Sequence, residues 1–171
     1  MLVDMDTMTA VQSDACPMGI PRAGVGRFAV VPLHRPVPSG LVWRAVFRAD
    51  VRLARVVRLF AAEGLGRWRV GRWYCVDEVQ TVASELFANA VVHGSTADGN
   101  VLVVLRKSYR RLRIEVHDSS PVLPVAAVAG EDWESGRGLL MVGELADSWG
   151  SVRTAKGKCV FARFRARGWS R

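Results

Sequence analysis

An acid, a carboxamide and an imidazole recur at intervals of four in the segment SELFANAVVHG, residues 84–94. Residues four apart share one face of an α-helix, so Glu85, Asn89 and His93 are expected to form one polar stripe. A glutamate can accept a proton, and an asparagine oxygen can bind Mg²⁺, which in turn bridges phosphate oxygens. The spacing therefore predicts Glu85 as a general base and Asn89 as a magnesium ligand. His93 either contacts phosphate or interacts with the helix C-terminus beside Gly94.

Asp118 ends an alternating segment, LRIEVHD, that is typical of a strand with one buried face. A carboxylate at the end of a buried strand can accept a hydrogen bond from an exocyclic amine, as adenine offers and guanine does not at the same ring position. Asp118 could instead cap the turn at Ser120, but its place after a buried strand favours contact with adenine.

A third motif, ESGRGLLMVGELADSWG, begins with Gly136 and Gly138 on either side of Arg137. Leu139 starts the apolar side of the helix that this segment predicts. Glycines at a helix entrance let backbone N–H groups approach phosphate closely, and the helix dipole favours an anion there. Arg137 is then either a phosphate clamp or an ordinary surface arginine.

In this order the three motifs resemble the ATP-binding domain shared by gyrase, heat-shock chaperones, sensor histidine kinases and mismatch-repair ATPases, the Bergerat fold. They are most similar to the single-domain bacterial anti-sigma-factor serine kinases, and the resemblance covers roughly residues 42–166. The residues that carry it are Glu85-Leu86, Asn89-Ala90, His93-Gly94, Asp118, Gly136-Arg137-Gly138-Leu139, Leu145-Ala146-Asp147 and Trp149-Gly150.

The resemblance implies that the chain binds ATP and Mg²⁺ and is a cytoplasmic protein serine/threonine kinase with slow turnover. Its partners would be an antagonist domain, whose serine it phosphorylates, a sigma factor, which it sequesters, or both; the chain could also form a homodimer. The alternative is a protein-interaction module whose bound nucleotide only sets its conformation. Phosphate transfer to an antagonist would distinguish the two.

The sequence departs from the superfamily at two places. The turn after Asp118 reads Ser119-Ser120-Pro121 and has no glycine, so its backbone is less free to approach a nucleotide. The last strand of the family often carries a threonine beside the adenine-binding aspartate. The expected equivalent here is Cys159, which would lose the hydroxyl hydrogen bond and keep the shape.

The chain of 171 residues is long enough for one domain with a hydrophobic core. No stretch approaches the roughly 18 apolar residues of a membrane span, and no secretory signal is visible. The three cysteines, Cys16, Cys75 and Cys159, are not spaced as metal ligands and are typical of a reducing compartment.

Positive charge is unevenly distributed in a chain of net charge +8. Residues 41–73 hold eight arginines against two acids, whereas residues 74–152 hold eleven acids against six basic residues. No pattern of a nucleic-acid-binding module accompanies the basic segments, so direct nucleic-acid binding is not expected. The basic face is either simply solvated or binds an acidic protein partner.

The elements that must position these motifs follow from periodicity. Asp50 is expected to cap a helix that ends at Gly64. The fold class is α+β, a two-layer sandwich with helices on one face of a mixed, mainly antiparallel sheet. Expected elements are strands 42–48, 100–106, 111–118, 148–154 and 158–166 and helices 51–63, 74–93 and 137–146. The resemblance implies a nucleotide lid at 119–135. The domain would span 41–166, between a loosely ordered tail 1–40 and a basic tail 167–171.

Overall fold

The strands and helices lie close to the positions that the sequence predicts. The computed structural model describes residues 41–94, 99–124 and 137–167. The elements are β1 (Leu41–Arg48), the 3-10 turn η1 (Val51–Leu53), α1 (Ala54–Arg67), α2 (Val76–His93), β2 (Asn100–Ser108), β3 (Arg111–Asp118), α3 (Arg137–Leu145), β4 (Ser148–Thr154) and β5 (Gly157–Arg165). The N-terminal tail, most of the expected lid and the last four residues lie outside the described residues.

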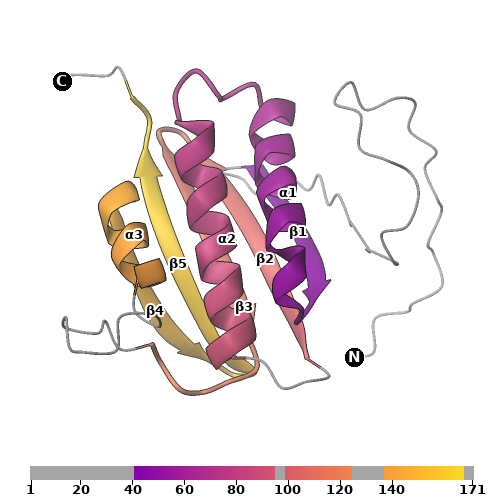
Figure 1. Cartoon of the computed structure of the whole chain (residues 1–171). Helices are drawn as coiled ribbons and strands as arrows, with labels where there is room; N and C mark the ends of the chain where they lie inside the picture. Colours follow the sequence, from indigo (N-terminus) through magenta and orange to yellow (C-terminus); the bar gives the residue numbers. More distant parts are fainter. Residues whose placement is uncertain (1–40, 95–98, 125–136, 168–171) are drawn as a thin grey trace, which may run out of the picture.

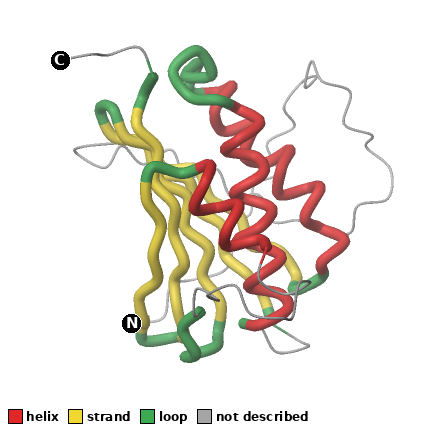
Figure 2. The backbone as a smooth tube through the Cα atoms, turned by 60° about the vertical axis from the view of Figure 1, so that its left-hand side comes forward, coloured by secondary structure: helices red, strands yellow, loops and turns green. Residues whose placement is uncertain are grey.

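The strands form one five-stranded sheet in the order β1-β2-β3-β5-β4. The helices lie together over one face of it, with α2 between α1 and α3 (Figure 1). A side view separates a layer of helices from a layer of strands (Figure 2). The predicted two-layer α+β sandwich is therefore confirmed. Each neighbouring pair of these strands is antiparallel, so the sheet is not mixed.

The hydrophobic core fills the space between the two layers. Alternate residues of each central strand point toward the helices, as in β3, where Leu112, Ile114 and Val116 are fully buried. Burying one such side chain contributes about 1.5–3 kcal/mol. Large buried residues from both layers include Trp43, Phe47, Val57, Leu65, Val79, Leu86, Phe87, Leu105 and Val160. This packing holds α2 firmly on the sheet and thereby fixes the direction of its polar stripe.

The start of the first helix follows the prediction, but its end does not. The side chain of Asp50 accepts a hydrogen bond from the backbone N–H of Arg52 at 3.0 Å and so caps the first turn. The helix continues past Gly64. A Cβ on Gly64 would lie 2.8 Å from Cδ1 of Trp43, whose indole donates to the carbonyl oxygen of Phe60 at 3.2 Å. Gly64 therefore permits close packing of α1 on β1.

The second face of the sheet, here called the open face, has no helix over it among the described residues (Figure 2). It carries the other set of alternating side chains, in which charged and apolar residues are mixed. No helix in the described ranges is both long and apolar enough to cross a membrane.

Candidate functional site

The polar stripe predicted from the sequence lies on α2. Asp77 and Glu78 stand in the first turn, where negative charge is favourable near the helix N-terminus. Further along, Glu85 and Asn89 are half-buried, and His93 is exposed in the last turn. Glu85 and Asn89 therefore form the half-buried part of the stripe, and His93 forms its exposed end.

Glu85 faces the entrance of α3. A Cβ on Gly138 would lie only 2.8 Å from Oε2 of Glu85, so the carboxylate stands directly against the α3 backbone. Glu85 forms no hydrogen bond or ion pair with the side chains of the described residues. Next to Gly138, Leu139 is half-buried against the core and Arg137 is exposed, whereas Gly136 lies outside the described residues. A carboxylate at this position can accept a proton from a group bound beside α2 and the start of α3.

Asn89, one turn after Glu85, has a buried amide nitrogen. Its Nδ2 has no hydrogen-bond partner among the described residues. Such a group destabilises the free protein unless water or a ligand satisfies it. The carboxamide can rotate about its last bond and present either its oxygen or its nitrogen to the same space. Asn89 can therefore bind a cation or donate to an anion there.

Asp118 is the last residue of β3, and its side chain is fully buried. Nζ of Lys158 and the backbone N–H of Ser120 both donate to Oδ1, each at 2.9 Å. Oδ2 is also buried but has no donor among the described residues. One carboxylate oxygen is thus held by the protein, and the other remains able to accept a hydrogen bond from a ligand.

Two glycines allow the chain to approach Asp118 this closely. A Cβ on Gly94, at the end of α2, would lie 2.4 Å from Cγ and 2.5 Å from Oδ2 of Asp118. Gly157, which starts β5, has φ +139, and a Cβ there would lie 2.0 Å from the carbonyl oxygen of Asp118. The end of α2, the end of β3 and the start of β5 therefore meet at Asp118.

The residue of β5 beside Asp118 is Lys158, so the expectation for Cys159 is wrong. Asp118 and Lys158 are cross-strand partners, as are His117 and Cys159. Neighbouring residues on a strand point to opposite faces, so Cys159 lies on the open face with His117 and Glu115. Sequence reasoning missed Lys158. Its signal was the alternation of β5, in which Lys158 has the parity of the buried residues Val160 and Ala162.

We expect Gly94→Ala to damage both stability and ligand binding. Asp118 is buried and ion-paired, so it cannot move away from a new methyl group, and overpacking of this kind costs about 1–3 kcal/mol. Urea denaturation should show a lower midpoint. The matched control is Gly66→Ala in α1, because a Cβ there meets nothing within 4 Å. That variant should gain about 0.5–1 kcal/mol from better helix propensity. Equal midpoints for both variants would contradict the close approach at Gly94.

Comparison with known proteins agrees with this geometry. The family model of the histidine kinase-like ATPase domain matches residues 47–164, from β1 into β5. Among solved structures, the fold is similar to the crystal structure of the RsbU and RsbW domains of Rv1364c from Mycobacterium tuberculosis, with a TM-score of 0.53 and 20% identity. The match covers 76% of this chain and 34% of that one, so this chain spans about a third of its length. At this identity the likeness shows the fold alone. No curated protein matches the chain.

Proposed function

Because the chain belongs to the family of histidine kinase-like ATPase domains, we propose that it is an Mg·ATP-dependent regulator of the anti-sigma-factor kinase type. It phosphorylates a serine of an antagonist protein, sequesters a sigma factor, or does both. The alternative function is a nucleotide-gated interaction module without kinase activity. Both functions need the same nucleotide site, and phosphotransfer distinguishes them.

The observation that carries the nucleotide proposal is Oδ2 of the buried Asp118, which has no donor within the described part of the chain. A buried acceptor without a donor costs about 1–3 kcal/mol, and the exocyclic amine of adenine supplies that donor. Lys158 and Ser120 already occupy Oδ1, which leaves Oδ2 to the ligand. Guanine would place a carbonyl oxygen at the same position, so two acceptors would face each other.

We assign the phosphate end of the nucleotide to the region where the polar stripe of α2 meets the start of α3. Asn89 binds Mg²⁺ through its side-chain oxygen, because carboxamide oxygens suit this hard cation. Glu85 takes the proton of the serine hydroxyl while that oxygen bonds to the γ-phosphorus and the bond to ADP breaks. The proposed phosphate contacts are His93, Gly136, Arg137, Gly138 and Leu139.

A direct test is the preference for adenine over guanine. With Mg²⁺ present, ADP should bind about tenfold to a hundredfold more tightly than GDP, which corresponds to about 1–3 kcal/mol for the mispaired carboxylate. Isothermal calorimetry on the full chain measures the dissociation constants of ADP and GDP in the same buffer. Equal affinities for ADP and GDP would contradict the proposal that Asp118 contacts the nucleotide base.

We further propose that the partner has an acidic surface and docks on α1 and η1. Arg52, Arg55 and Arg58 are all exposed on this segment. Arg52 already pairs with Asp50, the capping residue, at 2.7 Å. Arg55 and Arg58 are therefore the cleaner positions for a test. Complementary charge of this kind speeds association and is weakened by salt.

Arg55→Glu with Arg58→Glu should reduce capture of the sigma factor or antagonist domain, and added salt should reduce capture by the parent. Nucleotide affinity should not change. A matched control is Arg111→Glu with Arg165→Glu, which makes the same charge change at exposed, paired positions of β3 and β5. If both double variants captured the partner equally well, α1 would not be the docking face. A homodimer and a cytoplasmic location are further parts of the proposal, and the cytoplasmic location agrees with cysteines that are typical of a reducing compartment.

A further inference from the structure

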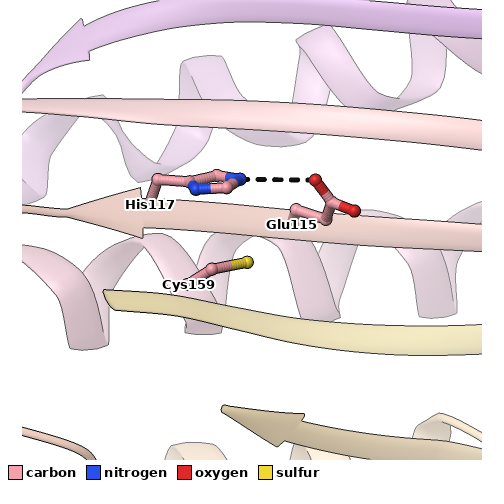
Figure 3. A group of neighbouring side chains, drawn as sticks. All are labelled: Glu115, His117 and Cys159. Carbon is pink, nitrogen blue, oxygen red and sulfur yellow. Dashed lines mark hydrogen bonds and ion pairs between the residues drawn. The ribbon is translucent and has the colours of Figure 1, made fainter. Parts of the chain in front are cut away.

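Three side chains with metal-binding atoms converge on the open face of the sheet. They are Glu115, His117 and Cys159, here called the open-face cluster (Figure 3). Their ligand atoms all lie within 4.8 Å of one another, and Nε2 of His117 is 3.3 Å from Oε2 of Glu115. The cluster faces away from the helices and therefore lies outside the proposed nucleotide site.

The sheet itself brings these residues together. Glu115 and His117 are two apart on β3 and so share a face, and Cys159 of β5 is the cross-strand partner of His117. The remaining cross-strand neighbours of His117 and Cys159 are apolar, Leu102 on β2 and Val152 on β4. A polar cluster is thus held by a rigid antiparallel ladder between apolar side chains.

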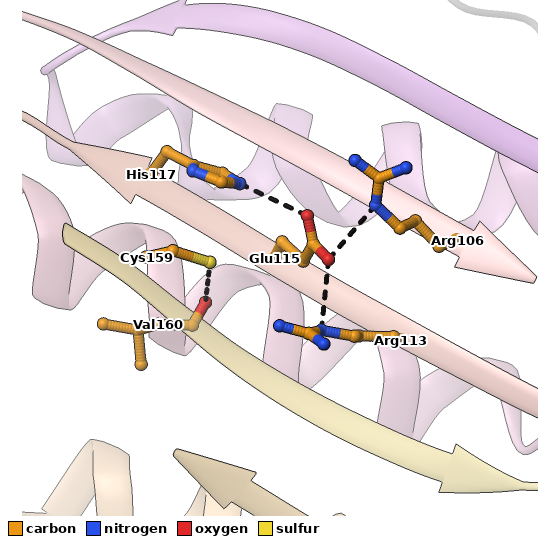
Figure 4. Close-up of polar contacts among 6 residues, drawn as sticks. All are labelled: Arg106, Arg113, Glu115, His117, Cys159 and Val160. Carbon is orange, nitrogen blue, oxygen red and sulfur yellow. Dashed lines mark hydrogen bonds and ion pairs between the residues drawn. The ribbon is translucent and has the colours of Figure 1, made fainter. Parts of the chain in front are cut away.

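An ion-pair network accounts for only part of this arrangement. Oε1 of Glu115 lies 3.1 Å from Nε of both Arg106 and Arg113, while Oε2 is turned toward His117 (Figure 4). The thiol of Cys159 forms none of these ion pairs, although a hydrogen bond with it helps to raise the pKa of His117. Cys159 is 3% exposed, and its thiol donates weakly to the backbone carbonyl oxygen of Val160 at 3.9 Å.

We propose that Glu115, His117 and Cys159 bind a zinc ion on the open face of the sheet. Thiolate, imidazole and carboxylate are the three ligand types that Zn²⁺ prefers, and three protein ligands leave a fourth position for water or a partner's side chain. The ligands are one anionic oxygen, one neutral nitrogen and one anionic sulfur, so they balance the charge of the ion.

The distances fit this assignment. Tetrahedral zinc with ordinary bond lengths requires its nitrogen, oxygen and sulfur ligands to be about 3.4–3.6 Å apart. His117 and Glu115 already have nearly that separation at 3.3 Å. All three ligand atoms lie within 4.8 Å of one another, so the sulfur has to move by at most about 1 Å. Arg106 and Arg113 would remain on Oε1 and orient the carboxylate, as outer partners of metal ligands commonly do.

Protons compete with the metal at this site. Hydrogen bonds with Cys159 and Glu115 raise the pKa of His117 to about 9. Zinc must displace a proton from the imidazole and another from the thiol, so its apparent affinity should be modest and should increase with pH.

The test is titration of the metal-free full chain with Co²⁺ as a spectroscopic substitute, followed by competition with Zn²⁺. We expect one equivalent to bind and to give the near-ultraviolet charge-transfer band of a thiolate–cobalt bond. Cys159→Ser should abolish that band, and His117→Ala should weaken binding more than the roughly 10–100-fold loss typical of an outer-shell partner. The control variant Cys16→Ser with Cys75→Ser should keep both the band and the affinity.

A band that persists in Cys159→Ser, or no thiolate band in the parent, would overturn the proposal. If Cys159→Ser failed to fold, the loss or retention of metal affinity in His117→Ala would test the proposal. The His117 side chain is 31% exposed, so its removal should leave the core intact. Metal binding should also persist in Asn89→Ala. A failure of the nucleotide proposal would therefore leave this result unchanged.

Discussion

Glu85→Gln should lower phosphotransfer by about 10²–10⁴-fold, the usual contribution of a general base, with ADP affinity nearly unchanged. The amide keeps the size of the carboxylate and its place against Gly138 but cannot accept the serine proton. A loss confined to turnover indicates an interaction made in the transition state. Initial rates with labelled ATP and an antagonist domain, with calorimetry on the same samples, would separate rate from affinity.

Asn89→Ala is the matched comparison, one turn further along α2. It removes the proposed magnesium ligand, so both the affinity for Mg·ATP and the turnover should fall. If Glu85→Gln phosphorylated the antagonist as fast as the parent, the catalytic role of Glu85 would be wrong. If the parent bound ATP but transferred phosphate to no acceptor, the nucleotide-gated interaction module would be the better description.

The second large effect is expected at the buried pair of Asp118 and Lys158, whose side chains are 0% and 1% exposed. Lys158→Met would leave an unpaired buried carboxylate, and Asp118→Leu would leave an unpaired buried ammonium. Each single change should lower the free energy of unfolding by about 3–5 kcal/mol, the usual cost of breaking a buried ion pair. Urea denaturation of both variants measures these losses.

The double variant, Asp118→Leu with Lys158→Met, separates stability from recognition. Replacing both charges with apolar groups of similar shape is often neutral, so much of the lost stability should return. Leucine has the branching of aspartate but no acceptor, so the preference for ADP over GDP should remain absent. A double variant as unstable as the sum of the two single variants would show that the pair is not coupled. If the double variant still preferred ADP over GDP, a residue other than Asp118 would recognise the base.

Local spacing was enough to predict the elements that carry the site. The four-residue spacing of Glu85, Asn89 and His93 depends only on helix geometry, and α2 places them as expected. The alternation before Asp118 likewise predicted the bounds of β3 correctly. These features were predictable because each depends on residues within one element.

Features that depend on two elements could not be predicted in the same way. Gly64 looked like a helix end, but the ring of Trp43 on β1 is what requires a glycine there. Cys159 was placed beside Asp118, although the neighbouring Lys158 has that position. Register between β3 and β5 decides this, and an error of one residue moves a side chain to the other face. The pairing of Cys159 with His117 depends on the same register.

Two successive residue pairs of the ladder between β3 and β5 face opposite sides of the sheet and have different roles. His117 and Cys159 face one side of the sheet, and Asp118 and Lys158 face the other. An insertion or deletion of one residue early in β5 would exchange the thiol and the ammonium between the two sides. A deletion would place the thiol opposite the buried carboxylate, whereas an insertion would place the ammonium opposite the imidazole. Evolution can therefore alter these two surfaces by substitution, whereas any change in strand length here alters both at once.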